Sequence, residues 1–586
     1  MASSIQEESN ERPISGAKSR SSASPVAIND DGVNEISTVQ SDDSKAPPTS
    51  YLQSWRLWVI YVATLFTMFL VPLDMTIVAT AIPKVTEEFH RLDEVGWYGS
   101  AFFLTLAVFQ SPWGKVYKFY PLRWAYAASV FVFEFGSLIC ALSRNSEMLI
   151  VGRVITGCGG AGITIGTYVV IANLVPPAKA PGFIGGIGAA FSIASVAGPL
   201  VGGAFTEEVS WRWCFYVNLP IGGAAFLIFF LLFPKPTTPL PQASLKEKLL
   251  QLDLVGATLA VSAVVCYFLA LEWGGVRKAW NNGSVIGTLV AWILLSIAFA
   301  VVQWFLKERA SIIPRILKQR HVAGGSAFMF LLGCANFLMI YNLPLYFQSV
   351  KGSSPTKSGI LVLPLIVSAS LFVIASGILF TKFPFYQFYL LFGASFTAIG
   401  AGLLYTLKVD SYSGAYLGYQ IVVGIGNGAC QQIPLTVVQA FSKPEDLATS
   451  MSTVLFFQLL SGAMSVAAAQ SIFINRLLSA VATRLPDIDP AIVIATGATD
   501  LQRVFTPSQL PAIRQSYLDG LHAAWAMAIA FAGAALLTGL SLGFKKIEKP
   551  QGKPADKEQD VGENEKDADS RKSEVVATVE EKAIEA

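Results

Sequence analysis

The sequence has little charge for its length. Only 14% of its 586 residues are Asp, Glu, Lys or Arg, whereas 53% are hydrophobic, and about a quarter of a soluble domain is normally charged. The formal net charge is +2, and the basic residues are scattered through loops and tails, which argues against nucleic acid as a partner. This composition excludes an ordinary water-soluble protein.

Residues that bind metals or form disulfides are also scarce. The three histidines, His90, His321 and His522, are expected in loops or at the ends of apolar runs, so no metal centre is predicted. The six cysteines lie in or beside apolar runs without CxxC spacing, and we interpret them as packing residues. No cofactor is predicted, and the chain is not expected to be an enzyme.

Long apolar runs make up most of the chain. A helix that crosses about 30 Å of hydrocarbon needs roughly 20 mostly apolar residues, because its backbone polar groups must be satisfied within the segment. Fourteen such runs lie at about 55–78, 97–116, 124–142, 148–175, 183–205, 213–233, 254–273, 285–305, 322–341, 359–380, 388–407, 415–437, 449–474 and 521–544. They predict an all-α polytopic membrane protein with 14 transmembrane helices. The polar segments 1–50 and 549–586 are predicted to be disordered tails.

Basic residues orient these spans. An even number of spans places both tails on one side, where the short loops carry fourteen Lys and Arg residues against nine on the other side. Because cytoplasmic loops are enriched in Lys and Arg, we expect both termini to be cytoplasmic. The single Asn-x-Ser/Thr sequon, at Asn282, then lies outside and is a predicted glycosylation site. We expect a multi-pass protein of the plasma membrane, with a vacuolar or vesicle membrane as the alternative.

A weak internal repeat suggests two related halves. Arg153, Gly157 and Gly159 match Gln420, Gly424 and Gly426 at one constant offset. Transporters are commonly built from two such helix bundles around a site near the bilayer midplane. We therefore predict a 6+2+6 architecture, with an amino-terminal six-helix bundle in 51–233, a linker with two extra spans in 234–306 and a carboxy-terminal six-helix bundle in 307–548.

Three ionisable residues within the runs are candidates for proton coupling, because a charge in hydrocarbon is costly. Arg153 cannot release its proton at ordinary pH, so it could set the charge of a cavity or tune a carboxylate; snorkelling to the interface is the alternative. Glu134 lies in the middle of its run, and Asp74 near the end of another. Movement of Glu134 between a buried site and an arginine would suit proton coupling, although a protonated Glu134 bonded to one neighbouring helix is an equal alternative.

Uncharged polar residues at membrane depth are candidates for a substrate cavity. Asn336, Gln431 and Gln458 fall within the apolar runs. They could contact a substrate or simply form hydrogen bonds between helices. In the fifth run, Pro199 should bend the helix and the surrounding glycines should let neighbouring backbones approach closely, which suits either a rocking motion or static packing.

These motifs resemble those of the major facilitator superfamily, and within it the fourteen-span drug:proton antiporters and the fungal toxin and multidrug efflux pumps. The resemblance covers about residues 55–544. Residues 73–78 are similar to the span-one motif of that branch, and Gly152-Arg153 is similar to its span-four motif, whose arginine is tied to proton coupling. The segment 211–220, WRWCFYVNLP, is a signature of the fourteen-span branch. The antiporter motif of span five is matched by Gly198, Pro199, Gly202 and Gly203.

The cytoplasmic loop after the second span departs from the family pattern. The superfamily usually has an acidic residue and a glycine there, whereas this chain has Lys118 and Pro121, between Gly114 and Arg123. The departure puts in doubt a gate that is latched through that acid.

The resemblance implies proton-coupled efflux of small amphipathic organic molecules, such as a toxin, a secondary metabolite or a drug, by alternating access. The expected partners are the small-molecule substrate, protons and the lipid bilayer, and the chain is expected to act as a monomer. Two alternatives stay open, namely uptake of a nutrient or iron chelate by the same fold and a membrane receptor that does not transport. The identity of the substrate does not follow from the sequence.

Overall fold

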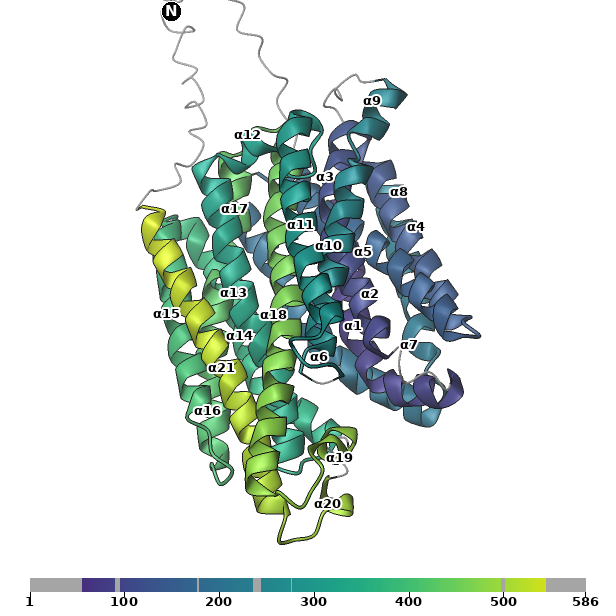
Figure 1. Cartoon of the computed structure of the whole chain (residues 1–586). Coiled ribbons are helices and arrows are strands. Elements are labelled where there is room, and N and C mark those ends of the chain that lie inside the picture. The colour runs from purple at the N-terminus through teal and green to yellow at the C-terminus, as the bar shows by residue number, and fades with distance from the viewer. Residues whose placement is uncertain are drawn as a thin grey trace, which may run out of the picture. The chain divides into compact units, whose positions relative to one another are not determined.

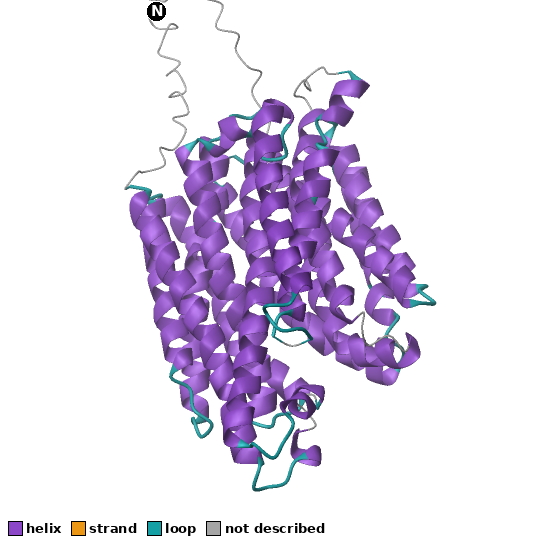
Figure 2. Ribbon diagram, viewed as in Figure 1, coloured by secondary structure: helices purple, strands orange, loops and turns teal. Residues whose placement is uncertain are grey.

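The computed structural model describes residues 55–89, 95–176, 179–234, 244–275, 277–496 and 501–543. These residues form helices joined by short loops, without a named strand among them (Figure 2). Thirteen of the helical segments are long and apolar enough to cross a membrane. The prediction of an all-α polytopic membrane protein is confirmed. The predicted tails and His90 lie outside the described residues.

The helices follow one another as shown in Figure 1. The first group is α1 (Trp55–Phe89), α2 (Val95–Val108), α3 (Gln110–Phe119), α4 (Leu122–Ala141), α5 (Ser146–Leu174), α6 (Ala180–Glu208), α7 (Trp213–Tyr216) and α8 (Asn218–Leu232). Then come α9 (Leu245–Leu250), α10 (Leu254–Trp273), α11 (Gly283–Leu306), η2 (Lys307–Arg309) and α12 (Pro314–Leu317). The second group is α13 (Arg320–Leu345), η3 (Tyr346–Val350), α14 (Pro355–Lys382), α15 (Tyr386–Tyr405), α16 (Ser413–Cys430), α17 (Ile433–Phe441), α18 (Leu447–Arg484), α19 (Pro490–Ala495), α20 (Leu501–Val504) and α21 (Leu510–Ser541).

The second predicted span is divided in the structure. Helices α2 and α3 are separated at Phe109, one turn before Pro112. Proline has no backbone N–H, so Pro112 cannot bond to the carbonyl of Val108 and the helix is interrupted there. The apolar part, Trp97–Val108, is shorter than the thirteen long spans. The total of fourteen spans therefore stays a prediction.

Helices α18 and α21 extend beyond their predicted spans. Helix α18 continues to Arg484 and α21 begins at Leu510, so much of the predicted connection between them is helical. The ion pair between Arg484 and Asp519, 2.6 Å long, joins the two extensions. His522 consequently lies inside α21, at the point where the extension meets the predicted apolar run, with a ring nitrogen 2.9 Å from the carbonyl oxygen of Leu407. His321 lies in the first turn of α13, as predicted.

Helices α10 and α11 form a peripheral pair. Ala257, Ala260 and Val264 of α10 pack against Leu104 and Val108 of α2, and α10 also contacts α18. Helix α11 buries only 6% of its most apolar segment, so most of its surface is left for lipid. The pair thus lies against both helix groups without occupying the interior of either.

Two glycines of the internal repeat make equivalent contacts. A side-chain carbon at Gly159 of α5 would overlap the backbone of Phe133 in α4, and one at Gly426 of α16 would overlap the backbone of Thr397 in α15. Glycine is the residue that allows backbones to approach so closely. Helix α5 therefore packs on α4 in the same way as α16 packs on α15.

The first residues of the repeat also correspond. Arg153 Nε donates to the carbonyl oxygen of Tyr98 in α2 at 2.9 Å, and Gln420 Nε2 donates to that of Leu361 in α14 at 3.0 Å. Both side chains are fully buried. The two halves thus share this hydrogen bond, but only the first half carries a charge there.

A glycine substitution can test this packing. Because the backbone of Thr397 has no room to move aside, Gly426→Ala should lower stability by about 1–3 kcal/mol. The control is Gly418→Ala on the same helix, where nothing lies within 4 Å of the added carbon; alanine there should be neutral or stabilising by up to about 1 kcal/mol. Thermal unfolding of both variants in detergent measures the difference, and equal melting temperatures would contradict the packing.

The two chain ends of the described helices lie at the same end of the molecule. Near the start of α1, the Tyr61 hydroxyl donates to the carbonyl of Phe183 in the first turn of α6, and that turn packs on the last part of α14 through Pro181 and Gly377. At the start of α15, the Tyr386 hydroxyl donates to the carbonyl of Leu542, just after α21. We call this end, at the top of Figure 1, the tail-side end.

Candidate functional site

A fully buried ion pair joins α5 to α1. The guanidinium of Arg153 donates through Nη1 to the carboxylate of Asp74, and neither side chain is exposed. Nη2 donates to the backbone carbonyl of Asp74 at 3.3 Å. The ring of Phe102 lies 4.4 Å from the guanidinium carbon and that of Phe215 lies 5.9 Å away. Arg153 is therefore held inside the helix group and does not extend to the interface.

Two uncharged side chains extend the ion pair toward α4 and α8. Asn218, the first residue of α8, donates through Nδ2 to Asp74 Oδ1 at 3.3 Å and to the Ser137 hydroxyl at 3.1 Å. The sequence analysis did not single out Asn218 as a site residue. The available signal was an amide inside the otherwise apolar WRWCFYVNLP segment.

Glu134 lies one helical turn from Ser137 on the same side of α4, because residues three apart share a helix face. Both carboxylate oxygens are buried and have no hydrogen-bond partner among the described residues. A side-chain carbon at Gly222 of α8 would overlap this carboxylate, so the close approach of α8 requires the glycine. Arg153 is paired with Asp74, and within the described part of the chain no ion pair is formed by Glu134.

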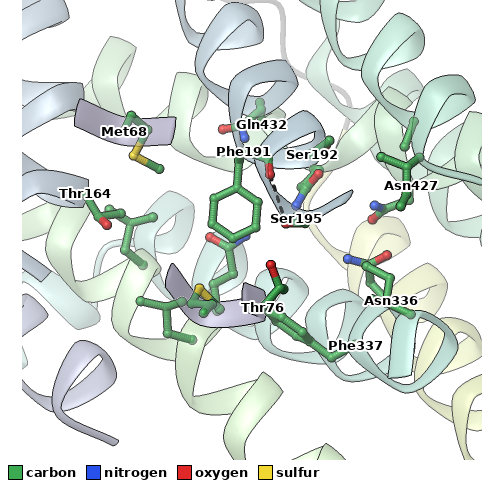
Figure 3. A pocket seen from close by; sticks show the side chains of 18 of the residues that line it. Met68, Thr76, Thr164, Phe191, Ser192, Ser195, Asn336, Phe337, Asn427 and Gln432 are labelled. Atoms are coloured by element: carbon green, nitrogen blue, oxygen red, sulfur yellow. Dashed lines mark hydrogen bonds between the residues drawn. The ribbon is translucent and has the colours of Figure 1, made fainter. Parts of the chain in front are cut away.

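The cavity of this region lies between the two helix groups and has an empty volume of about 920 Å³, including space open to solvent. Figure 3 shows side chains from both groups converging on it. The three amides predicted for a substrate cavity, Asn336, Gln431 and Gln458, all line it. Asn427 of α16 lines it as well. It lies four residues before Gln431, and this spacing of two amides was a signal that the sequence prediction did not use.

The cavity and the ion pair share α1. Met75 and Thr76 line the cavity, whereas the preceding residue, Asp74, faces α5 and α8. A shift of this turn of α1 would therefore change the contacts of both the ion pair and a bound molecule.

Helix α6 packs directly on this part of α1. A side-chain carbon at Gly198 would overlap Thr76, and one at Gly202 would lie 2.8 Å from the carbonyl oxygen of Ile77. Gly203 faces open space, and Pro199 lies inside the continuous helix. Two glycines of the predicted antiporter motif thus fix the contact between α6 and the segment that follows Asp74.

Comparison with known proteins places this arrangement in a family. The model of the Major Facilitator Superfamily matches residues 64–466. The chain belongs to the major facilitator superfamily. This confirms the resemblance found in the sequence, and because the family consists of transporters, the prediction of a transporter is confirmed as well.

Several proteins that are similar to this transporter come from fungi. It is 45% identical over 512 residues to the MFS-type transporter thnB of Trichoderma harzianum, covering 87% of this chain and 88% of that one. It is 43% identical to the probable efflux pump gsfJ of Penicillium aethiopicum, covering 85% and 89%, and 40% identical to the dehydrocurvularin exporter of Aspergillus terreus, covering 92% and 95%. Among solved structures, the proton:xylose symporter XylE superposes with a TM-score of 0.54 at 14% identity, covering 84% and 98%, which shows the shared fold.

At the tail-side end, one ion pair joins the two helix groups of the transporter, and a second ion pair holds its acid in place. Lys118, at the end of α3, lies 3.4 Å from the carboxylate of Asp446, which immediately precedes α18. Arg315 of α12 donates to the same carboxylate at 2.9 and 3.0 Å. Gly114 of α3 packs closely on Ser452 of α18. Lys118 of the first helix group is therefore paired with an acid of the second helix group.

The remaining predicted residues lie elsewhere. Arg123 stacks on Phe230 of α8, with its guanidinium carbon 4.3 Å from the ring centre, and takes no part in the tail-side contacts above. Asn282 is exposed and caps α11, its side-chain oxygen accepting from the N–H of Ser284 at 2.9 Å. Glycosylation of Asn282 stays a prediction.

The tail-side contacts should depend on pH through Asp446. Hydrogen bonds from Arg315, assisted by the charge of Lys118 and opposed by burial, lower the pKa of the Asp446 carboxyl. A lowered folded-state pKa means that this stabilisation is present above the ordinary pKa of about 4 and is lost as pH falls through the folded-state value. Asp446→Asn should remove this part of the pH dependence of thermal unfolding. The control, Asp519→Asn, removes a more exposed pair; equal effects of both variants would contradict the assignment.

Proposed function

We propose that this transporter exports small amphipathic organic molecules and that proton entry drives the export. The observation that carries the proposal is the pair of buried carboxyl groups in the first helix group, of which Asp74 is paired with Arg153 and Glu134 has no partner among the described residues. The direction is supported by relatives named as a probable efflux pump and as a dehydrocurvularin exporter.

Proton coupling would use the difference between the two carboxyl groups. A carboxyl group without a partner costs less to bury when it is protonated, so Glu134 is the first proton acceptor in this proposal. Asn218 and Ser137 join the helix turn of Glu134 to Asp74. Protonation of Asp74 would cancel its attraction to Arg153 and loosen α1 from α5.

Loosening α1 would couple the proton to the substrate. The turn after Asp74 both lines the cavity and packs on α6, so its movement changes the cavity and the position of α6 together. Export then requires that the contact of Lys118 with Asp446 breaks when the tail-side end opens to load substrate, and that it forms again when the end closes. This is alternating access between the two helix groups.

The same proposal includes the organisation of the whole chain. We propose a 6+2+6 arrangement in which α10 and α11 are the two extra spans, with both termini cytoplasmic, Asn282 outside and the plasma membrane as the site of action. Both helix groups contribute to one cavity within a single chain, which supports a monomer as the transporting unit.

Accumulation in cells distinguishes export from uptake. Cells that express the transporter should retain less of a fluorescent hydrophobic compound than cells without it, and a protonophore should remove the difference, because export depends on the proton gradient. The control is a strain that expresses the Glu134→Gln variant at the same level. Higher accumulation in the expressing cells would favour uptake instead.

A further inference from the structure

The cavity has one wall built of uncharged amides. Asn336 of α13, Asn427 of α16, Gln431 just after α16 and Gln458 of α18 line it, all from the second helix group. Amides carry both a hydrogen-bond donor and an acceptor. This wall can therefore bind polar groups of either kind without adding charge.

Two of these amides lack partners. The side-chain oxygens of Asn336 and Asn427 are buried and accept no hydrogen bond from the described residues, and the two residues are only 7% and 4% exposed. Both line the same cavity, one from α13 and one from α16 (Figure 3). A buried carbonyl oxygen without a partner costs about 1–3 kcal/mol, so a ligand that donates to these oxygens would recover that free energy.

The first helix group gives the cavity an apolar patch, next to the hydroxyl groups of Thr76, Thr164, Tyr168, Ser192 and Ser195. Met68 of α1, Phe103 of α2 and Phe191 of α6 line it from the first helix group, and Figure 3 shows Met68 and Phe191 across from the asparagines. Methionine and aromatic rings suit flat apolar surfaces of varied shape. The cavity thus has an apolar patch on the first helix group and uncharged amides on the second.

The lining residues of this cavity include no Asp, Glu, Lys, Arg or His in the described part of the chain. Arg153 and Asp74 pair with each other between α5 and α1, so neither charge is free to pair with a ligand. An ion that bound here would lose its hydration and gain no counter-charge from the lining residues, which is strongly unfavourable.

We infer that the exported molecules are uncharged when they bind and place a hydroxyl group against Asn336 and Asn427, with their apolar face on the methionine and aromatic wall. The inference rests on the proposed export function and specifies its substrate class. A hydroxyl group can donate to the unpartnered oxygens and accept from the amide N–H groups. A methyl ether can only accept.

Binding to the purified full-length transporter tests the substrate class. The probes are three uncharged phenols, estradiol, resveratrol and bisphenol A, each beside its fully methylated ether, with tetraphenylphosphonium as a cation and tetraphenylborate as an anion. We expect at least one phenol to bind, its ether to bind about tenfold more weakly because a carbonyl oxygen stays unpaired, and neither ion to compete. Binding of no phenol, equal binding of phenol and ether, or competition by an ion would overturn the inference.

Substitutions identify the residues. Asn336→Leu and Asn427→Leu should abolish the preference for phenol over ether without lowering the melting temperature, because each removes a buried oxygen that has no partner among the described residues. The matched control is Asn342→Leu on α13, where the native amide donates to the Leu338 carbonyl at 2.7 Å; this variant should keep the preference. Loss of the preference in the control, or its retention in both test variants, would contradict the assignment.

The two proposals can fail separately. If phenols bind as expected but none is exported by vesicles under a proton gradient, the export function fails and the cavity chemistry stands. If neutral and ionic compounds are exported equally well, the export function stands and the inference fails.

Discussion

Replacing Arg153 with methionine should abolish gradient-driven transport and destabilise the transporter by about 3–5 kcal/mol, because breaking a buried ion pair leaves an uncompensated charge. Asp74 would lose its charged partner, and the carbonyl of Tyr98 would lose a hydrogen bond. Thermal unfolding in detergent measures the loss of stability, and flux into vesicles measures the loss of coupling. A variant as stable as the wild type would mean that the pair does not hold α1 on α5.

Two controls separate the charge from the packing. Arg153→Met combined with Asp74→Asn removes both charges, so it should recover much of the stability while transport stays uncoupled. Arg277→Met removes an exposed ion pair with Glu272, 3.3 Å long, and should cost at most about 1 kcal/mol. Recovery of gradient-driven transport in the double variant would contradict a role for this pair in coupling.

Glu134→Gln should make transport independent of the proton gradient while leaving the transporter as stable as before or more so. Glutamine has nearly the shape of a protonated glutamate, and the native oxygens have no partner to lose among the described residues. Exchange of labelled for unlabelled substrate across vesicles, which needs no proton movement, should continue. Measurement of both rates in one preparation separates loss of coupling from loss of binding.

The control for Glu134 is Glu88→Gln. Glu88 lies near the end of α1 and forms an ion pair with Arg212 at 2.7 Å, with 44% of its side chain exposed. Its removal should leave coupling unchanged. Gradient dependence that survives in Glu134→Gln, or that disappears equally in Glu88→Gln, would show that Glu134 does not carry the proton.

Hydrophobic runs predicted most of the fold because lipid requires long apolar helices with satisfied backbones. The hydrophobic runs did not predict helices that continue beyond the apolar segments, nor a break within one. The extensions of α18 and α21 carry Arg484 and Asp519 and lie beyond the apolar runs, so hydropathy gives no signal for them. The break before α3 depends on the single missing N–H of Pro112, which an average over the run does not register.

The sequence predicted which residues belong to the candidate site better than it predicted which of them contact one another. Arg153, Asp74 and Glu134 could be selected because a charge in an apolar run is rare, but helix rotation decides that Arg153 faces Asp74 and leaves Glu134 alone. Lys118 was recognised as a departure from the family, whereas its partner Asp446 is 328 residues away in the sequence and could not be found from a loop motif. The cavity amides Asn336, Gln431 and Gln458 were predicted as possible contacts, and the structure brings them together.

The most direct test of proton-coupled export is flux of an uncharged hydrophobic compound in vesicles that contain the purified transporter. An imposed pH gradient should drive the compound against its concentration gradient in the wild type, and the compound should move the opposite way when the pH gradient is reversed. Arg153→Met and Glu134→Gln should show no uphill movement at either polarity. Uphill flux that is the same with and without the gradient, or that survives both substitutions, would contradict the account.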